Sequence, residues 1–271
     1  MPSPQESIAL ADLVSKWRRQ ADALDSAEYF VAADNVTACA KFEDGHQWPT
    51  EAPPGVLQLT YNICPSFTNH AGNVVKKNPP SIKVIQGDEG DEKIAKRFDS
   101  LIDDIENRSF ASSVYTSAFD QCTSSSFGMW RIVVEEGKRK DPATGKRRTE
   151  LRLRHVKNPA TVLIDPTAEQ PGMVDMEWFC LPTTMTKKAF EHEFKGKAVD
   201  SFDTEVKEWF DGDTVTIAEF WFKDAARGGA WSQWFVSGTE ILEKNSEYPG
   251  TVFPVCLVHS RERTVDGKRR Y

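Results

Sequence analysis

Residues 127–136 read FGMWRIVVEE, and the hydrophobic period of the chain changes at this stretch. Upstream, apolar residues recur every three or four positions, as on one face of a helix; from Met129 onward they alternate, as in a half-buried strand. A second alternating run, residues 149–157, follows a loop that contains Asp-Pro-Ala-Thr-Gly. The pattern predicts a β-hairpin whose long, basic tip covers residues 137–148. Helices first and antiparallel strands afterwards predict an α+β fold.

Four helices are predicted before this hairpin. The first is an amphipathic helix of roughly 30 residues that ends near Val31. The others are predicted at residues 64–77, 92–107 and 109–124. In the third helix, the predicted inner face comprises Ile94, Phe98, Leu101, Ile102 and Ile105. The short link to the fourth helix predicts antiparallel packing of these two. A loop is predicted at residues 50–55 and a short strand at residues 81–86.

Strands predominate after the hairpin. They are predicted at residues 162–164, 175–180, 214–222, 231–237 and 252–258, with short helices at residues 186–194 and 203–210. Thr186 is the predicted N-cap of the first short helix. We therefore divide the chain into a mainly helical part, residues 1–126, and a mixed, mostly antiparallel β part, residues 127–271.

The composition of the chain excludes several classes of protein. Its 271 residues carry a formal net charge of −7, which disfavours a free-standing nucleic-acid binder because phosphate binding needs a basic surface. The five cysteines are dispersed and contain no CxxC pair, which predicts reduced, buried thiols. No run approaches roughly 18 consecutive apolar residues, so no membrane span is expected. The first residues lack the pattern of a secretory signal.

Motifs for catalysis or cofactor binding are weak. The sequence contains no P-loop, no GxGxxG and no GxSxG, so we expect no cofactor and no enzymatic activity. Glu191-His192-Glu193 lacks the second histidine that a zinc helix requires. Asp211-Gly212-Asp213 is typical of a turn. The rival interpretation is a metal-dependent enzyme in which Asp211, Asp213 and Glu219 bind the ion.

Two further groups of residues suggest binding surfaces. A dense basic run occupies the predicted hairpin tip: Lys138, Arg139, Lys140, Lys146, Arg147 and Arg148. A solvated tip is the ordinary interpretation, and contact with DNA phosphates or with an acidic patch on a partner is the alternative. Trp221, Trp231 and Trp234 could form the platform of a carbohydrate-binding module. Alternation across adjacent strands favours packing in the core and at interfaces instead.

A series of short motifs resembles the portal proteins of short-tailed double-stranded DNA bacteriophages of the enterobacterial type. In the first half these are Phe42, Gly45–Pro49, Asn62–Ile63, Asn78–Val84, Asp91–Ile105, Ala118–Phe119 and Phe127–Arg131. In the second half they are Val162–Pro166, Trp178, Val215–Trp221, Phe253–Pro254 and Asp266–Lys268. The resemblance extends from about Trp17 to Tyr271. From this resemblance we take six residues as a structural motif: Trp48, Phe127, Gly128, Trp130, Asp165 and Pro166.

The resemblance implies a structural subunit without enzymatic activity. Portal subunits form a ring, usually of twelve copies, at one vertex of the capsid, and double-stranded DNA passes through the ring during packaging and ejection. The implied partners are capsid, scaffolding, terminase and tail adaptor proteins, and the implied location is the virion, with assembly in the host cytoplasm. The residues would form the wing region, so we expect a fragment that lacks the stem and the clip. The charged hairpin-like piece at residues 264–268, after which the chain stops, agrees with that expectation.

Overall fold

The computed structural model shows two compact units, which we describe separately. Unit 1 comprises residues 1–32 and 160–253, and unit 2 comprises residues 33–159 and 254–271. The structure describes residues 11–15, 33–48, 53–87, 90–140, 145, 147–165, 167–168, 170, 173–196, 210–211, 213–224, 227–237, 240–245, 248, 252–259, 263–265 and 268–270. These units are bounded differently from the predicted parts of the wing region, and the division after residue 126 stays a prediction.

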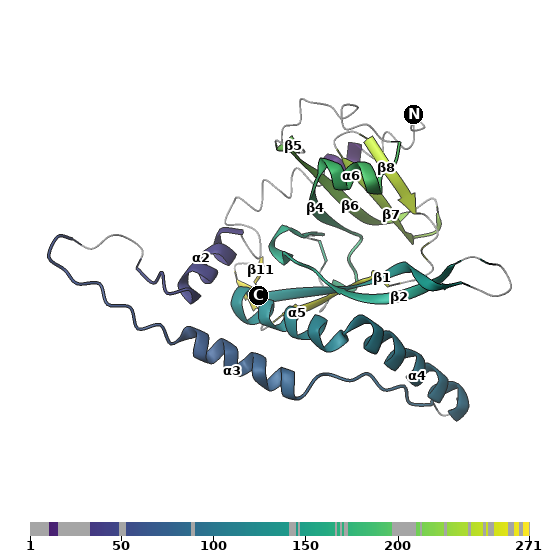
Figure 1. Cartoon of the computed structure of the whole chain (residues 1–271), viewed down its shortest axis with the longest axis horizontal. Coiled ribbons are helices and arrows are strands. Elements are labelled where there is room, and N and C mark those ends of the chain that lie inside the picture. The colour runs from purple at the N-terminus through teal and green to yellow at the C-terminus, as the bar shows by residue number, and fades with distance from the viewer. Residues whose placement is uncertain are drawn as a thin grey trace. The chain divides into compact units, whose positions relative to one another are not determined.

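Unit 1 is built on a six-stranded sheet (Figure 1). Along its main path the strand order is β3-β4-β6-β7-β8, and β5 pairs with β6. The strands are β3 (Leu163–Ile164), β4 (Trp178–Thr186), β5 (Phe210–Asp211), β6 (Thr214–Asp224), β7 (Ala230–Ser237) and β8 (Glu240–Asn245). All pairs are antiparallel. The predicted strand at 175–180 is therefore a longer strand that starts at Trp178, and β8 was not predicted.

Both faces of this sheet are buried. On one face Trp178, Phe220 and Trp234 pack around Leu13, which lies in the helical residues 11–15. On the other face α6 (Lys187–Glu193) inserts Phe190 among apolar strand residues. The period of two along each strand sends alternate side chains to the two faces. Most of the predicted N-terminal helix lies outside the described residues, as do residues 203–209 of the helix predicted at 203–210.

The N-terminus of α6 confirms the predicted cap. The Thr186 backbone is extended, and its Oγ1 accepts a hydrogen bond from the Ala189 amide at 3.3 Å. Such a bond satisfies one of the amide groups that a helix start leaves without a partner.

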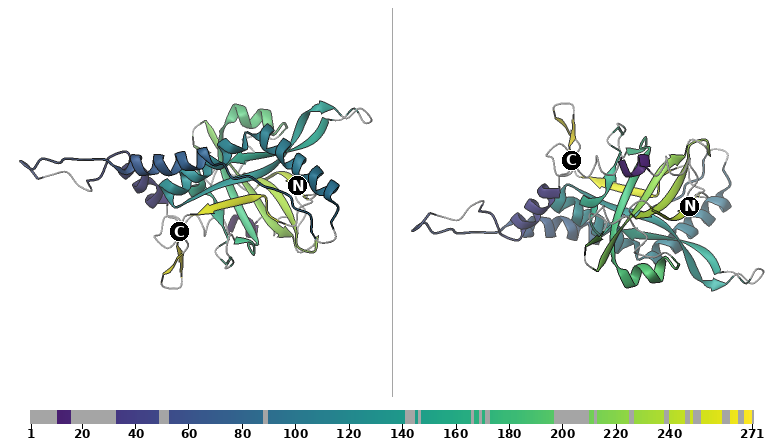
Figure 2. Two further views of the ribbon diagram at one scale, coloured as in Figure 1. Left: turned by 90° about the horizontal axis from the view of Figure 1, so that it is seen from below. Right: turned by 90° about the horizontal axis from the view of Figure 1, so that it is seen from above.

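Unit 2 combines four helices of the described chain with a three-stranded antiparallel sheet (Figures 1 and 2). The helices are α2 (Ala33–Glu43), α3 (Cys64–Lys77), α4 (Glu92–Ser109) and α5 (Ala111–Ser125). The sheet contains β2 (Arg147–His155), β1 (Phe127–Lys140) and β9 (Val255–His259), in that order. A separate hairpin, β10 (Arg263–Val265) with β11 (Lys268–Arg270), lies at the C-terminal end. The α+β class is confirmed.

The predicted helix at 64–77 and the predicted hairpin are confirmed, with Trp130 opposite His155 in the register of β1 and β2. Residues 81–86 do not form the predicted strand. The antiparallel packing predicted for α4 and α5 is also wrong (Figure 1). The only residue between them is Phe110, whose φ of 52° is left-handed. One such residue kinks the chain but is too short a link to reverse it.

The core of unit 2 lies between α5 and the sheet. Ala111 and Val114 of α5 pack on Leu153 of β2, with Trp130 and Ile132 of β1 beside them. All five cysteines are free, as predicted. Cys122 and Cys180 are buried and Cys39 is exposed, so the expectation of buried thiols holds for only part of the set.

Candidate assembly surfaces

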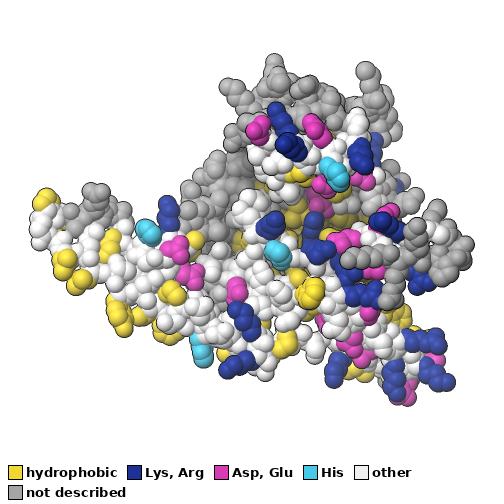
Figure 3. Space-filling model, viewed as in Figure 1, with side chains coloured by type: hydrophobic (Ala, Val, Ile, Leu, Met, Phe, Trp, Pro, Cys, Tyr) yellow, Lys and Arg dark blue, Asp and Glu magenta, His cyan; other side chains and the backbone are white. Residues whose placement is uncertain are grey.

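Exposed apolar side chains are concentrated on an arm between α2 and α3, which we define as residues 44–48 and 53–63. The arm extends from the helices of unit 2 (Figures 1 and 2). Leu57, Leu59 and Tyr61 are 77%, 75% and 87% exposed. Figure 3 shows hydrophobic side chains along this part of the molecule. The second stretch of the arm contains no charged residue.

Hydrogen bonds give the arm one polar side and one apolar side. Trp48 Nε1 donates to Thr60 Oγ1 at 3.2 Å, and Gln47 Nε2 donates to Asn62 Oδ1 at 3.1 Å. Asn62 Nδ2 in turn donates to the backbone oxygen of Glu43 at 2.6 Å. Alternate side chains of an extended chain point to opposite sides. The apolar residues that alternate with these polar ones therefore face solvent.

A second apolar surface lies on α4. Ile94, Phe98 and Leu101 recur at the spacing of one helix face, and each remains about half exposed, at 51%, 54% and 51%. We call these three residues the α4 face. The prediction that they form the inner face of the helix is wrong, because only the C-terminal half of the stripe, around Ile105, packs against the core.

The extended residues 81–86 lie beside α4. The backbone amide of Val84 donates to Asp99 Oδ1 at 3.1 Å, which holds this segment along the helix. Ile82 and Ile85 of the same segment are exposed.

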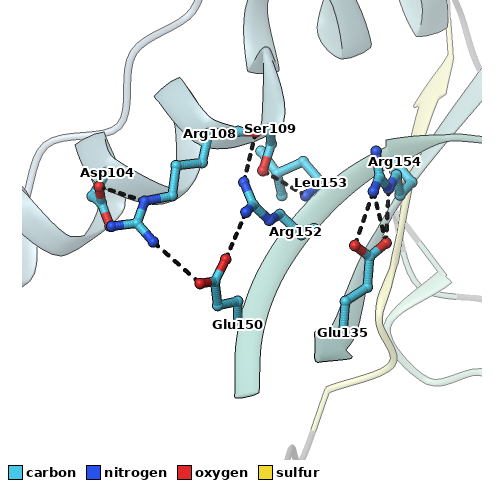
Figure 4. Close-up of polar contacts among 8 residues, drawn as sticks. All are labelled: Asp104, Arg108, Ser109, Glu135, Glu150, Arg152, Leu153 and Arg154. Carbon is cyan, nitrogen blue, oxygen red and sulfur yellow. Dashed lines mark hydrogen bonds and ion pairs between the residues drawn. The ribbon is translucent and has the colours of Figure 1, made fainter. Parts of the chain in front are cut away.

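A polar network holds the C-terminal end of α4 on β2 (Figure 4). Arg152 donates from Nη1 to the backbone oxygen of Arg108 at 2.6 Å and from Nη2 to Glu150 Oε2 at 2.6 Å. The Ser109 hydroxyl is buried and accepts the Leu153 amide at 3.0 Å. Because helix carbonyls at a C-terminus lack partners within the helix, the guanidinium of Arg152 acts as a cap.

Two arginines of β2 allow a matched comparison of a partly buried ion pair and a more exposed one. The Arg152 side chain is 22% exposed, whereas Arg154, which forms two 2.9 Å bonds with Glu135, is 53% exposed. Arg152→Met should lower the free energy of unfolding by about 1.5–3 kcal/mol, because charged hydrogen bonds are lost inside the structure. Arg154→Met should cost less than about 1 kcal/mol. Urea unfolding followed by circular dichroism measures both, and equal losses would contradict the role of Arg152.

An open groove of about 1040 Å³ lies where the end of α3 meets α5. Its lining is rich in serine hydroxyls and includes Glu106, Tyr115 and Asp120. The Tyr115 hydroxyl donates to Glu106 Oε1 at 2.8 Å. Burial, followed by this hydrogen bond and the nearby negative charge, raises the pKa of Tyr115 well above its ordinary value. Tyr115 therefore stays a neutral donor at physiological pH.

The residues of the sequence motif occupy separate places in the structure. Trp48 lies on the arm, and Phe127, Gly128 and Trp130 lie on β1. Asp165 lies in unit 1, and the adjacent Pro166 is outside the described residues. Within unit 2, Trp48 and the three residues of β1 therefore lie on separate elements.

Two members of this motif make contacts with a clear physical role. Gly128 lies so close to α5 that a Cβ would overlap the backbone oxygen of Ala118. The Asp165 carboxylate is buried and accepts bonds from the Thr167 amide at 3.0 Å, the Thr167 hydroxyl at 2.7 Å and the Glu177 amide at 3.0 Å. Such bonds satisfy a buried charge and hold the turn that follows β3.

The basic hairpin tip is described only in part. The side chains of Lys138, Arg139, Lys140 and Lys146 lie outside the description. Arg147 and Arg148 are exposed, and Arg147 lies 3.8 Å from Glu136 in a weak surface pair. Contact of this tip with phosphates or a partner stays a prediction.

The carboxylates of the metal-enzyme hypothesis do not converge. Asp211 pairs with Thr214 across the turn between β5 and β6, and its side chain is outside the description. Asp213 and Glu219 are six positions apart on an extended chain, or roughly 20 Å. Glu219 is buried and accepts bonds from Trp221 Nε1 at 2.8 Å and Gln233 Nε2 at 2.7 Å. Among the described residues, no cluster of His, Cys, Asp and Glu has the geometry of a metal site.

The tryptophans of the carbohydrate hypothesis belong to the core. Trp221, Trp231 and Trp234 are only 6%, 2% and 7% exposed. Trp221 stacks on Phe179 with ring centroids 5.9 Å apart. A sugar platform needs an exposed ring face, so these residues cannot serve as one in this fold.

The arm is the surface that our sequence interpretation missed. Leu57, Leu59, Tyr61 and Ile63 alternate with polar residues, and this period of two was the available signal. The network around Arg152 had no comparable signal, because its partner Arg108 lies far away in the sequence.

An exposed apolar arm and an apolar helix face on one unit are typical of proteins that assemble with other polypeptide chains. The comparison with family models gives the particular family. The chain matches the model of the Phage P22-like portal proteins over residues 25–271, and it belongs to that family. The match confirms the resemblance and supports a structural role in a phage portal, an oligomeric ring in the capsid of the virion.

The search of curated proteins gave no match to the chain. Within the part of the chain that the structure describes, none of the helices combines the length and apolar character needed to cross a bilayer.

Proposed function

We propose that the chain is a subunit of the portal ring through which phage DNA enters and leaves the head. The match to the portal family over residues 25–271 carries this proposal. In this proposal, the ring contains twelve copies of the chain and lies at one capsid vertex. Capsid, scaffolding, terminase and tail adaptor proteins bind to the ring there. Assembly takes place in the host cytoplasm.

The charge of the chain suits this role. A ring that lets DNA slide should bind phosphates weakly, because each contact adds affinity and slows movement. The net charge of −7 agrees with weak binding. The basic hairpin tip is the local exception, and we propose that it contacts DNA phosphates or an acidic patch on a neighbouring subunit.

Both predicted parts, residues 1–126 and 127–271, belong to the wing region in this proposal. The α4–β2 network keeps the C-terminal end of α4 on the sheet of unit 2, which supports the helix that carries the α4 face. Rigid presentation lowers the entropy cost of association, so it suits a subunit of a permanent assembly.

The position of the chain in the particle tests the proposal directly. An antibody raised against the chain should label a single vertex of purified virions by immunogold electron microscopy, because a portal occupies one vertex only. Antibody against the major capsid protein serves as the control and should label the whole head. Labelling spread over the head, or confined to the tail tip, would overturn the proposed function.

A further inference from the structure

The two apolar surfaces of unit 2 lie at opposite ends of that unit. The arm projects beyond α3 at one end, and the N-terminal half of α4 lies at the other (Figures 1 and 2). The helices α3 and α5 lie between them, so the arm does not cover the α4 face of its own chain. Each surface therefore needs a partner from outside the unit.

The two surfaces match each other in polarity. The second stretch of the arm is uncharged, and its exposed side chains are large and apolar. On α4, Arg108, which lies near the apolar stripe, is 2.8 Å from Asp104 of the same helix. An uncharged arm that covers this face adds no charge of its own to the buried area.

Residues 81–86 give a second reason to expect that the arm binds beside α4. They alternate as a strand does, yet the structure leaves them extended beside α4 and outside its sheets. A strand is stable only with a neighbouring strand. The arm is extended as well, so it can lie next to this segment and add backbone hydrogen bonds to the apolar contact.

A second copy of the chain is the partner that fits these observations. A projecting surface at one end and a complementary face at the other produce a head-to-tail contact, which closes into a ring when the rotation between copies allows it. We propose that the arm of one subunit docks on the α4 face of the next, with Leu57, Leu59 and Tyr61 covering Ile94, Phe98 and Leu101. This inference rests on the proposed ring and specifies which surfaces join its subunits.

Two single substitutions separate the two halves of the contact. Leu59→Asp places a charge in the apolar surface of the arm, and Phe98→Asp places a charge in the α4 face. Both positions are exposed, so the fold and the melting temperature should stay unchanged. Each variant should self-associate about 30-fold or more weakly than the unchanged chain in sedimentation velocity and native mass spectrometry. Val174→Asp, an exposed apolar position in unit 1, is the matched control and should associate normally.

Mixing the two variants gives the decisive result. The Phe98→Asp copy keeps its arm and the Leu59→Asp copy keeps its α4 face, so an equimolar mixture should form a heterodimer that cannot grow further. If arms bound arms, the Phe98→Asp variant would associate as well as the unchanged chain, and the proposed contact would be wrong.

The remaining outcomes distinguish this inference from the proposed function. Oligomers that form equally well with both variants would overturn the arm contact and leave the portal ring in place. A heterodimer in the mixture together with diffuse labelling of virions would support the contact and reject the portal role. If a partner other than a second copy covers the arm, the unchanged chain should stay monomeric at every concentration, and that result would also overturn the inference.

Discussion

Substitution of Gly128 by alanine is expected to lower the free energy of unfolding by about 3 kcal/mol or more. Gly128 lies in β1, opposite Val258 of β9, and its Cα faces α5. A Cβ here would overlap the carbonyl oxygen of Ala118 and would lie 3.0 Å from Cβ of Gln121. Because the obstacle is helix backbone, the clash can be relieved only by moving α5 away from the sheet.

Urea unfolding followed by circular dichroism measures this loss. Gly87→Ala is the matched control, because Gly87 is exposed and an added Cβ would have open space around it. The control should change the free energy of unfolding by less than about 0.5 kcal/mol. If the two variants were equally stable, the close approach of β1 and α5 would not be essential to unit 2.

Phe179→Ala is expected to cost about 3–5 kcal/mol of unfolding free energy in unit 1. Phe179 is 1% exposed and lies at the centre of an aromatic cluster on one face of the six-stranded sheet. Its ring centroid lies 5.9 Å from Trp221, 6.1 Å from Trp231 and 5.9 Å from Phe253. Truncation would leave a cavity beside rigid rings, which cannot move together to fill it.

Tryptophan fluorescence during urea unfolding reports this change, because two indole rings line the cavity. Val174→Ala, an exposed position in the same unit, should shift the transition by less than about 0.5 kcal/mol. The carbohydrate hypothesis makes the opposite prediction, since an exposed binding platform would tolerate loss of Phe179. A loss below about 1 kcal/mol would therefore count against the core role of these aromatic residues.

The arm also gives the motif around Trp48 a physical meaning. The indole Nε1 bonds to Thr60, and this bond joins the two stretches of the arm. The motif thus shapes the surface that we propose to join neighbouring subunits.

Much of the fold could be predicted because its signals are local. The switch of hydrophobic period at Phe127 marked the start of the β region, and the proline after Asn78 marked the end of a helix. Thr186 was recognised as an N-cap because a hydroxyl side chain just before a helix typically accepts a hydrogen bond from an amide of the first turn. The family resemblance was also visible in the order of short motifs, and the family match confirmed it.

The predictions that failed all depended on which surfaces meet. Periodicity shows that Ile94, Phe98 and Leu101 share a face, but the same pattern is expected whether that face is covered by its own chain or by another. The alternation of residues 81–86 is typical of a strand. A strand also requires a partner strand, however, and local sequence does not specify which segments pair.

The sequence by itself therefore determined most of the helices and strands and the family of the protein, whereas α2 and β8 were not predicted. Only the tertiary structure decided that Arg152 caps α4 and that the arm and the α4 face stay exposed. The physical reason is that these outcomes depend on contacts between residues far apart in the chain, which local hydrophobic spacing does not specify.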